Sequence, residues 1–383
     1  MSSLSAAQFD FDLPEELIAT KPAAQRDQSR LLLVGRDHVA HHTFAELPDL
    51  IERFVGEKPL LVVNDSKVLL ARLFARKIGT GGEPGGRVEL LLLEPHNATT
   101  AAATSWRVMY RTSKPLRQGA SLSLLDRQGQ PLTGCTLTVR TVEGEGRAIL
   151  DFPTETPLTE LLSQAGELPL PPYIVRQRQL SGESASPEDD ERYQTVYAKE
   201  LGSVAAPTAG LHFTDPLLAQ LAARGVERAS VTLHVGPGTF MPLRDDDPLK
   251  HVMHSERYQV PPETVEAIAR ARRDGRKVLA VGTTVVRTLE SATLEGHTIP
   301  QPGLGETRLF IYPQPGPQPP TGRYPFRVVD AMLTNFHLPR STLLMLVAAF
   351  AGTERILHAY QQAIAARYRF YSYGDAMLLP TRM

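Results

Sequence analysis

The second half of the chain alternates apolar runs with amphipathic segments whose lengths are typical of strands and helices. The segment TDPLLAQLAARG predicts a helix, because Thr214 is an N-cap residue, Pro216 falls in the first turn and Gly225 ends the pattern. The segments after it predict, in order, strand 229–235, helix 261–275, strand 277–281, helix 283–292, strand 330–336, helix 341–352, helix 353–368 and strand 370–379. This alternation predicts βα units and a mostly parallel sheet.

The pattern is different from about residue 63 to residue 152. Short alternating segments such as GGRVELLLLEP, SWRVMYRTS and CTLTVRTVEGEGRAILDF are joined by glycine-rich or polar turns, and no convincing helix interrupts them. We expect residues 63–152 to form a small antiparallel barrel or sandwich, inserted into an α/β domain built from residues 1–62 and 153–383. The polar segment 178–194 predicts a mobile loop, and the proline-rich segment 312–325 predicts an extended connector.

Composition narrows the class of protein. A length of 383 residues favours two domains, and 42% hydrophobic with 22% charged residues is typical of a soluble globular protein. The formal net charge of −1 excludes a uniformly basic nucleic-acid coat but not a local basic face. The single cysteine, Cys135, excludes an intramolecular disulfide and a cysteine-rich zinc site. The N-terminus lacks the features of a signal peptide, and the run LLMLVAAFAG is too short to span a bilayer, so we expect a cytoplasmic protein.

Residues suited to ligand binding follow three of the predicted strands. The carboxyl ends of parallel strands meet at one edge of a sheet, and helix N-termini there offer free N–H groups to a carboxylate or phosphate. Each end taken alone is explained by an ordinary turn or helix cap, but three in one sheet favour a site for a small polar ligand. The residues at these ends are His234, Gly236, Gly238, Thr239, Gly282, Thr283, Thr284, Asn335, His337 and Ser341.

Histidines are the candidate acid–base groups, because the imidazole pKa of about 6.5 lies close to neutral pH. His212 directly precedes the cap of the helix that starts at residue 214. His251 and His254 are three residues apart, but no third ligand follows at helical spacing, so a metal site is not favoured. The densest basic stretches, RARRDGRK and RYRFYSYG, suit RNA phosphates and bases, although a solvated helix face and core aromatic residues explain them equally well.

Seven stretches taken together resemble the signature segments of the S-adenosylmethionine:tRNA ribosyltransferase-isomerase family of queuosine biosynthesis. They are, in order, NDSKVLLAR, APTAGLHFT, VTLHVGPGTFMP, HVMHSE, VGTTVVRTLE, TNFHLPRSTLLMLVAAFAG and YRFYSYGDAML. The opening segment FDFDLPEELIATKPAAQRDQSRLLLV also resembles the family, so the resemblance covers nearly the whole chain. It implies an α/β fold, with a barrel-like α/β main domain and a small inserted antiparallel β-barrel domain.

The resemblance also implies a reaction. The ribosyl part of S-adenosylmethionine is transferred to 7-aminomethyl-7-deazaguanine at the wobble position of tRNA and isomerised, which gives epoxyqueuosine and releases adenine and methionine. S-Adenosylmethionine is therefore expected as a co-substrate, with no permanently bound cofactor and no metal. The chemistry requires a base for the carbon beside the sulfonium, an acid for the departing adenine and an unprotonated amine, and histidine suits each task near neutral pH.

Three sets of residues follow from this resemblance. The catalytic set is His212, His234, His254 and His337, with Glu256 and Asp375 orienting two of the rings. The S-adenosylmethionine set is Gly236, Gly238, Thr239, Gly282, Thr283, Thr284, Asn335 and Ser341, in which Thr283 and Thr284 hold the methionine carboxylate. Arg72, Arg76, Arg367 and Arg369 are expected to face the anticodon arm of tRNA. We also expect a monomer.

Two other functions stay open at this point. A methyltransferase would also use S-adenosylmethionine, but it requires a glycine-rich loop after an N-terminal strand, and residues 31–40 offer only Gly35. A catalytically inert tRNA-binding module built on the β domain would leave the histidines, Thr283, Thr284 and Ser341 without a role. The products formed from S-adenosylmethionine and modified tRNA distinguish the three.

Overall fold

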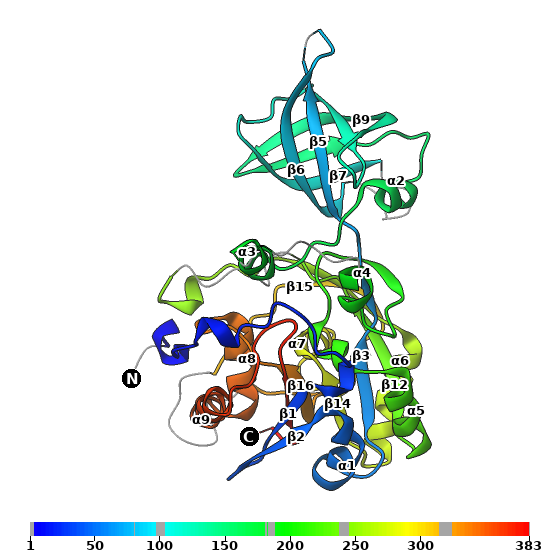
Figure 1. Cartoon of the computed structure of the whole chain (residues 1–383). Helices are drawn as coiled ribbons and strands as arrows, with labels where there is room; N and C mark the ends of the chain where they lie inside the picture. The colour runs from blue at the N-terminus through cyan, green and yellow to red at the C-terminus, as the bar shows by residue number, and fades with distance from the viewer. Residues whose placement is uncertain are drawn as a thin grey trace.

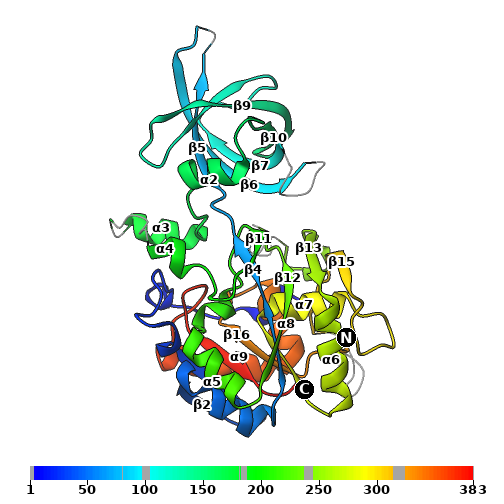
Figure 2. The same cartoon turned by 90° about the vertical axis from the view of Figure 1, so that its right-hand side faces the viewer.

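The chain folds into a larger α/β domain that carries both termini and a β-barrel joined to it by two connecting segments (Figure 1). The structure is a computed structural model, and it describes residues 4–79, 81–96, 104–180, 182, 188–236, 245–313 and 324–382. The quarter-turned view in Figure 2 shows the same separation of the two bodies. This arrangement confirms the expected fold class, an α/β main domain with a small barrel.

A nine-stranded sheet forms the centre of the larger domain, in the order β15-β13-β12-β3-β14-β16-β17-β1-β2. Its central strands β12, β3, β14 and β16 are parallel, whereas β13, β15 and β2 pair antiparallel at the two edges and β17 is antiparallel to β16. β17 and β1 pair parallel, so the sheet is mixed rather than mostly parallel. The bounds are β1 Arg30–Val34, β2 Val39–Thr43, β3 Leu60–Asn64, β12 Glu227–Leu233, β13 Glu256–Val260, β14 Val278–Val281, β15 Gly303–Thr307, β16 Ala331–Asn335 and β17 Ala376–Leu379.

Helices cover both faces of this sheet, because successive side chains of a strand point to opposite faces. In β3, Leu60 and Val62 belong to one buried cluster, and Leu61 and Val63 belong to another. The first cluster contains residues of α6 (Pro262–Arg273), α7 (Thr283–Ser291), α8 (Thr342–Ala351) and α9 (Thr353–Ala365). The second contains residues of α1 (Leu47–Leu50) and α5 (Asp215–Ala223). The predicted caps of α5 and α8 are present, since Thr214 accepts from the Leu217 N–H and Ser341 from the Leu344 N–H.

The inserted domain is a closed antiparallel barrel in the order β10-β7-β6-β5-β8-β9, which decides between the barrel and the sandwich. Its strands are β5 Arg72–Ile78, β6 Pro84–Pro95, β7 Ser105–Thr112, β8 Ser121–Leu125, β9 Pro131–Gly144 and β10 Arg147–Asp151. Val63 lies inside β3 of the main sheet, and β4 (Ser66–Val68) pairs with β11 (Glu200–Ser203), so the barrel strands begin at Arg72. Helix α2 (Leu158–Ala165) adds Leu161 and Leu162 to the barrel core.

The polar segment after the barrel contains two short helices, α3 (Pro172–Leu180) and α4 (Glu188–Arg192). Arg178 and Asp189 form an ion pair in which each side chain is only 6% exposed, and Arg178 also donates to the Thr20 carbonyl. The expectation of a mobile loop over 178–194 is therefore wrong at both ends of that segment, because a buried charge requires fixed partners. Residues 314–323 of the proline-rich connector lie outside the described residues.

No single helix among the described residues is long and apolar enough to cross a membrane. Helices α8 and α9 meet the length and composition test only as a pair, and they are bent by 114° relative to each other.

A buried carboxylate connects α7 to the chain that leads into β16. The Glu290 side chain accepts hydrogen bonds from the backbone N–H groups of Arg327, Val328 and Val329, at 2.9, 3.0 and 3.2 Å. Burial raises the pKa of Glu290, and the three N–H donors partly oppose this shift. The contact sets the position of α7 relative to β16, the two elements whose ends carry most of the candidate site.

We expect Glu290→Ala to lower the free energy of unfolding by about 3 kcal/mol or more, because three backbone donors lose a charged acceptor in a buried place. Urea unfolding followed by circular dichroism measures this change. Glu295→Ala, at an exposed position nearby, is the control and should change the free energy by less than about 0.5 kcal/mol. Equal effects of the two substitutions would contradict the anchoring role.

Candidate active site

A pocket lies at the carboxyl ends of β14 and β16. Gly282, Thr283 and Thr284 line it after β14, and Asn335 and His337 line it after β16. Ser341 at the start of α8 and Val235 after β12 complete this rim. The structure thus brings together the expected strand ends, but Gly236 is not among the lining residues, and Gly238 and Thr239 lie outside the described residues. The described residues that line the pocket carry no carboxylate, ammonium or guanidinium group.

The N-terminus of α7 lies at this pocket, and its first N–H groups have no hydrogen-bond partner among the described residues. Gly282 precedes the helix with a φ of 91°, a left-handed conformation that favours glycine, and no side chain caps the first turn. Thr283 is buried, and the Thr284 hydroxyl is buried without a hydrogen-bond partner among the described residues. Free N–H groups and a free hydroxyl at a helix start suit a carboxylate or phosphate. The Ser341 hydroxyl, by contrast, is already committed to the cap of α8.

Two tyrosines that the sequence analysis did not select form an aromatic wall of the pocket. Tyr173 of α3 and Tyr371 meet edge to face with ring centroids 5.0 Å apart. Burial raises the pKa of both phenols, so both stay protonated near neutral pH. Tyr371 has a φ of 72°, a backbone conformation that costs a non-glycine residue about 1 kcal/mol and that clusters at functional sites. The Asn335 amide N–H donates to its carbonyl at 3.0 Å and helps to hold this conformation.

His337 is the histidine that lines the pocket. Its Nε2 lies 3.0 Å from the Thr334 hydroxyl, and its backbone N–H donates to the Tyr360 hydroxyl. Burial lowers its pKa to about 3, so the ring is neutral near pH 7. The neutral ring offers a nitrogen as a hydrogen-bond partner to a bound molecule, and the burial that lowers its pKa also makes it a weaker base than free imidazole.

His212 is buried and His234 is half-buried next to the pocket, and neither lines its wall. His212 Nδ1 lies 2.6 Å from the Ser29 hydroxyl, and its ring stacks on Phe44 at 4.9 Å. His234 precedes Val235 on the chain, so its side chain points away from the pocket, against Gly202. A Cβ at Gly202 would lie 2.7 Å from this ring, so only glycine fits there. Burial lowers the pKa of each histidine to about 4.

His254 and Glu256 are not parts of an acid–base pair. His254 is exposed on the loop before β13. Glu256 is buried in an ion pair with Arg287, and its second oxygen accepts from the Gly236 N–H at 3.2 Å. The expectation that Glu256 orients a histidine ring is therefore not met, because its oxygens are occupied by a guanidinium and by the turn after β12.

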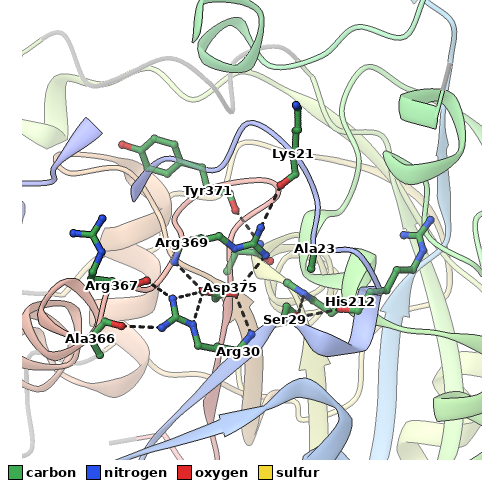
Figure 3. A network of polar contacts seen from close by, with 12 residues as sticks. Lys21, Ala23, Ser29, Arg30, His212, Ala366, Arg367, Arg369, Tyr371 and Asp375 are labelled. Carbon is green, nitrogen blue, oxygen red and sulfur yellow. Dashed lines mark hydrogen bonds and ion pairs between the residues drawn. The ribbon is translucent and has the colours of Figure 1, made fainter. Parts of the chain in front are cut away.

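Asp375 organises the C-terminal loop that carries Tyr371 (Figure 3). Its carboxylate accepts from the backbone N–H groups of Arg30 at 3.0 Å and Arg369 at 2.8 Å, and it forms an ion pair with the Arg30 guanidinium at 3.1 Å. Arg30 also donates to the carbonyls of Ala366 and Arg367. Asp375 thus fixes the backbone of this loop, and the described hydrogen bonds include none from its carboxylate to a histidine.

The four expected RNA-binding arginines differ in how far their charge is neutralised. Arg72 lies between Glu89 at 2.7 Å and Glu167 at 3.3 Å, so two carboxylates compensate it. Arg76 is exposed and forms no ion pair among the described residues. Arg367 is 69% exposed, and its one ion pair among the described residues is with Glu16, at 3.8 Å. Arg369 is 33% exposed and lies 3.6 Å from Asp375. No group of three or more metal-ligating side chains occurs in the described parts of the chain.

Comparison with known proteins gives consistent matches over the whole length. Residues 6–379 match the family model described as queuosine biosynthesis protein. A relative from Anaeromyxobacter sp. (strain Fw109-5) is 50% identical over 97% of this chain and 98% of its own length, and one from Azoarcus sp. (strain BH72) is 49% identical over 98% of each. Both are named S-adenosylmethionine:tRNA ribosyltransferase-isomerase. A solved structure of an S-adenosylmethionine tRNA ribosyltransferase from Thermotoga maritima is 33% identical, with a TM-score of 0.50, over 97% of this chain and 99% of that one.

The buried His212 generates a prediction on pH. Its pKa is about 4 in the folded chain and 6.5 when unperturbed, so the unfolded state binds the proton more readily. The stabilising effect of the neutral ring is therefore complete above pH 6.5 and is lost as the pH falls toward 4. We expect His212→Gln to reduce the pH dependence of the unfolding free energy in this window by up to about 1.4 kcal/mol per pH unit. Urea unfolding at several pH values measures it; His254→Gln is the exposed control, and an unchanged slope for His212→Gln would refute the assignment.

Proposed function

The chain belongs to the queuosine biosynthesis protein family, and from this premise we propose that it is an S-adenosylmethionine:tRNA ribosyltransferase-isomerase. The acceptor is the aminomethyl group of 7-aminomethyl-7-deazaguanine at the wobble position of tRNA, and the products are epoxyqueuosine, adenine and methionine. S-Adenosylmethionine is consumed as a co-substrate, and the reaction needs no metal. The observation that carries the proposal is the near-complete match to relatives of this name, at 50% identity over 97% of the chain.

The pocket supports S-adenosylmethionine as the molecule bound there. The methionine carboxylate would lie at the start of α7, where the uncapped N–H groups and the Thr284 hydroxyl have no partner among the described residues. The sulfonium would lie against the tyrosine rings, because the face of an aromatic ring attracts a cation. Tyr173 and Tyr371 supply such rings in the pocket lining, and no described lining group carries a charge that would repel it.

His337 is our candidate for the proton transfers at the bound substrate. It lines the pocket and is neutral near pH 7, whereas His254 is exposed and the rings of His212 and His234 pack outside the pocket lining. We propose that His212 and His234 position the residues that line the pocket. His212 supports the pocket wall through its contact with Ser29, and His234 supports the turn that starts at Val235. Asp375 and Glu256 act through the backbone of the two loops that they hold.

The tRNA would reach the pocket past the C-terminal loop. Arg367 and Arg369 lie on the same loop as Tyr371, and the exposed Arg367 has only a long contact to one carboxylate. Arg76 adds an unpaired charge on the barrel, while Arg72 is the weakest of the four candidates because Glu89 and Glu167 neutralise it. We propose a cytoplasmic, monomeric enzyme that binds tRNA through these few cations rather than through a general positive field.

Incubation of the protein with S-adenosylmethionine and tRNA that carries the aminomethyl base tests the function. We expect free adenine and methionine in amounts that match the modified tRNA, and no adenine when the aminomethyl group is missing. Liquid chromatography with mass detection identifies all products. Formation of S-adenosylhomocysteine would instead indicate a methyltransferase, and tRNA binding without any product would indicate an RNA-binding module.

Substitution of His337 tests its role in proton transfer. We expect His337→Ala to lower kcat by about a hundredfold or more, with a smaller change in KM for S-adenosylmethionine, because the loss falls mainly on the transition state. His254→Ala is the matched control and should keep near-normal turnover, since that ring is exposed on a loop. Adenine release at saturating tRNA is measured for both, with melting temperatures recorded. Normal turnover of a folded His337→Ala variant would assign the proton transfers to another group.

A further inference from the structure

The barrel differs in charge from the rest of the chain. Residues 72–151 contain eleven arginines and lysines and seven aspartates and glutamates, an excess of four positive charges in a chain whose net charge is −1. The remainder of the chain is accordingly acidic. An uneven distribution of this kind creates a local field that a net charge near zero conceals.

The acidic residues of the barrel are mostly used by a subset of its arginines. Arg107 pairs with Glu94 and Glu143, and Arg140 pairs with Asp151 at 2.9 Å. Arg72 forms an ion pair with Glu89, as described above. The cations that form no ion pair among the described residues include Arg76, Lys77, Arg87, Lys114 and Arg117, which we call the barrel cationic face.

These residues form two neighbouring groups that meet at the end of β5, one around Arg76 and one around Lys77. Arg76 of β5 and Arg87 of β6 are direct cross-strand neighbours on the outward side. The Lys77 ammonium donates to the carbonyls of Lys114 and Pro115, which joins β5 to the loop between β7 and β8. Burial lowers the pKa of Lys77, and the charges of Lys114 and Arg117 add to this shift. The cations therefore repel one another within the folded chain.

The repulsion between these neighbouring cations destabilises the barrel, and no carboxylate among the described residues forms an ion pair with them. Like charges directly opposite each other on paired strands cost up to about 1 kcal/mol. The Arg87 guanidinium lies 4.0 Å from the centroid of the Phe74 ring, so its position is held although no carboxylate binds it. Fixed, unpaired guanidinium groups are suited to a phosphate, which they bind through two parallel N–H···O contacts.

We propose that the barrel cationic face binds the sugar–phosphate backbone of the tRNA, at a part of the molecule other than the wobble nucleotide. This inference rests on the proposed function, which makes tRNA the polyanion that the chain must hold. The cleft between the two domains is less suited to that backbone, because Asp190, Glu191 and Asp215 line it beside Arg26 and Lys67.

The position of the face defines which part of the RNA it contacts. Arg76 and Arg87 flank the hairpin that joins β5 to β6, and this hairpin is the end of the barrel farthest from the main domain (Figures 1 and 2). The pocket lies in the main domain, at the ends of β14 and β16. When the wobble nucleotide lies in the pocket, the part of the RNA that extends to the barrel is therefore the paired stem and not the loop. The main domain then recognises the loop, and the barrel adds affinity through the stem.

Fluorescence anisotropy of labelled tRNA with the full-length protein tests the proposal at several salt concentrations. We expect the double substitution Arg76→Ala and Arg87→Ala to weaken binding about tenfold near 0.1 M salt and to reduce the slope of log Kd against log salt by about 1.5. The matched control is Arg127→Ala with Arg140→Ala, which removes the same charge from the barrel at arginines already paired with Asp190 and Asp151. Melting temperatures verify that both variants are folded.

Three results would overturn the proposal. The first is an unchanged Kd and salt slope in the Arg76/Arg87 variant, and the second is an equal loss in the control variant, which would indicate a general field. The third is displacement of tRNA from the wild-type protein by poly-glutamate as effectively as by unlabelled tRNA, which would indicate a site for an acidic protein. An RNA hairpin shortened to the anticodon loop and a few closing pairs should bind the wild-type protein and the Arg76/Arg87 variant equally. A tenfold difference in Kd for this hairpin would contradict the stem contact.

The binding assay requires no turnover, so its outcome is separate from that of the proposed function. If the variant loses RNA binding and the wild-type protein releases no adenine, the proposed RNA-binding surface is supported and the proposed reaction is rejected. If the variant binds RNA normally and the wild-type protein releases adenine, the proposed reaction is supported and the proposed RNA-binding surface is rejected.

Discussion

The burial of strands β3, β14 and β16 on both faces is the constraint on which the rest of the structure depends. Every residue of β3 and β14 is buried, with alternate side chains in two separate clusters. Helices must therefore cover both faces, and polar side chains that serve a ligand are confined to the ends of the strands. Since these central strands are parallel, their carboxyl ends meet at one edge, and there the turns after β12, β14 and β16 enclose the pocket.

Buried carboxylates hold the segments around this edge. Glu290, Asp375 and Glu256 each accept at least one backbone N–H, from the chain before β16, from the C-terminal loop and from the turn after β12. An isolated buried charge is unstable, so each acid requires several donors at once and thereby fixes the backbone that supplies them. The pocket is consequently formed by loops with fixed positions, although its own described lining carries no formal charge.

Charge is divided between the two domains in a way that suits a small cationic substrate and a large anionic one. The pocket offers helix N–H groups, hydroxyls and tyrosine rings, which are suited to a carboxylate and a cation. The barrel, which is separate from the domain that contains the pocket, carries the excess of arginine and lysine. Long-range attraction of RNA therefore does not require cations beside the sulfonium, where they would oppose its binding.

The sequence by itself determined the elements and the strand ends. Alternation, the caps at Thr214 and Ser341 and the glycine before Thr283 act over a few residues, so α5 to α9, the central strands β12, β14 and β16 and the barrel insert were readable without coordinates, whereas the edge strands β13 and β15 were not. Only the tertiary structure decided which histidine lines the pocket: His337 does, His212 packs on Ser29, which is 183 residues away in the chain, and His254 is exposed. It also brought Tyr173 to Tyr371 and neutralised Arg72 with Glu89 and Glu167. The physical reason is that burial and charge compensation depend on neighbours distant in sequence, and local patterns carry no information about those neighbours.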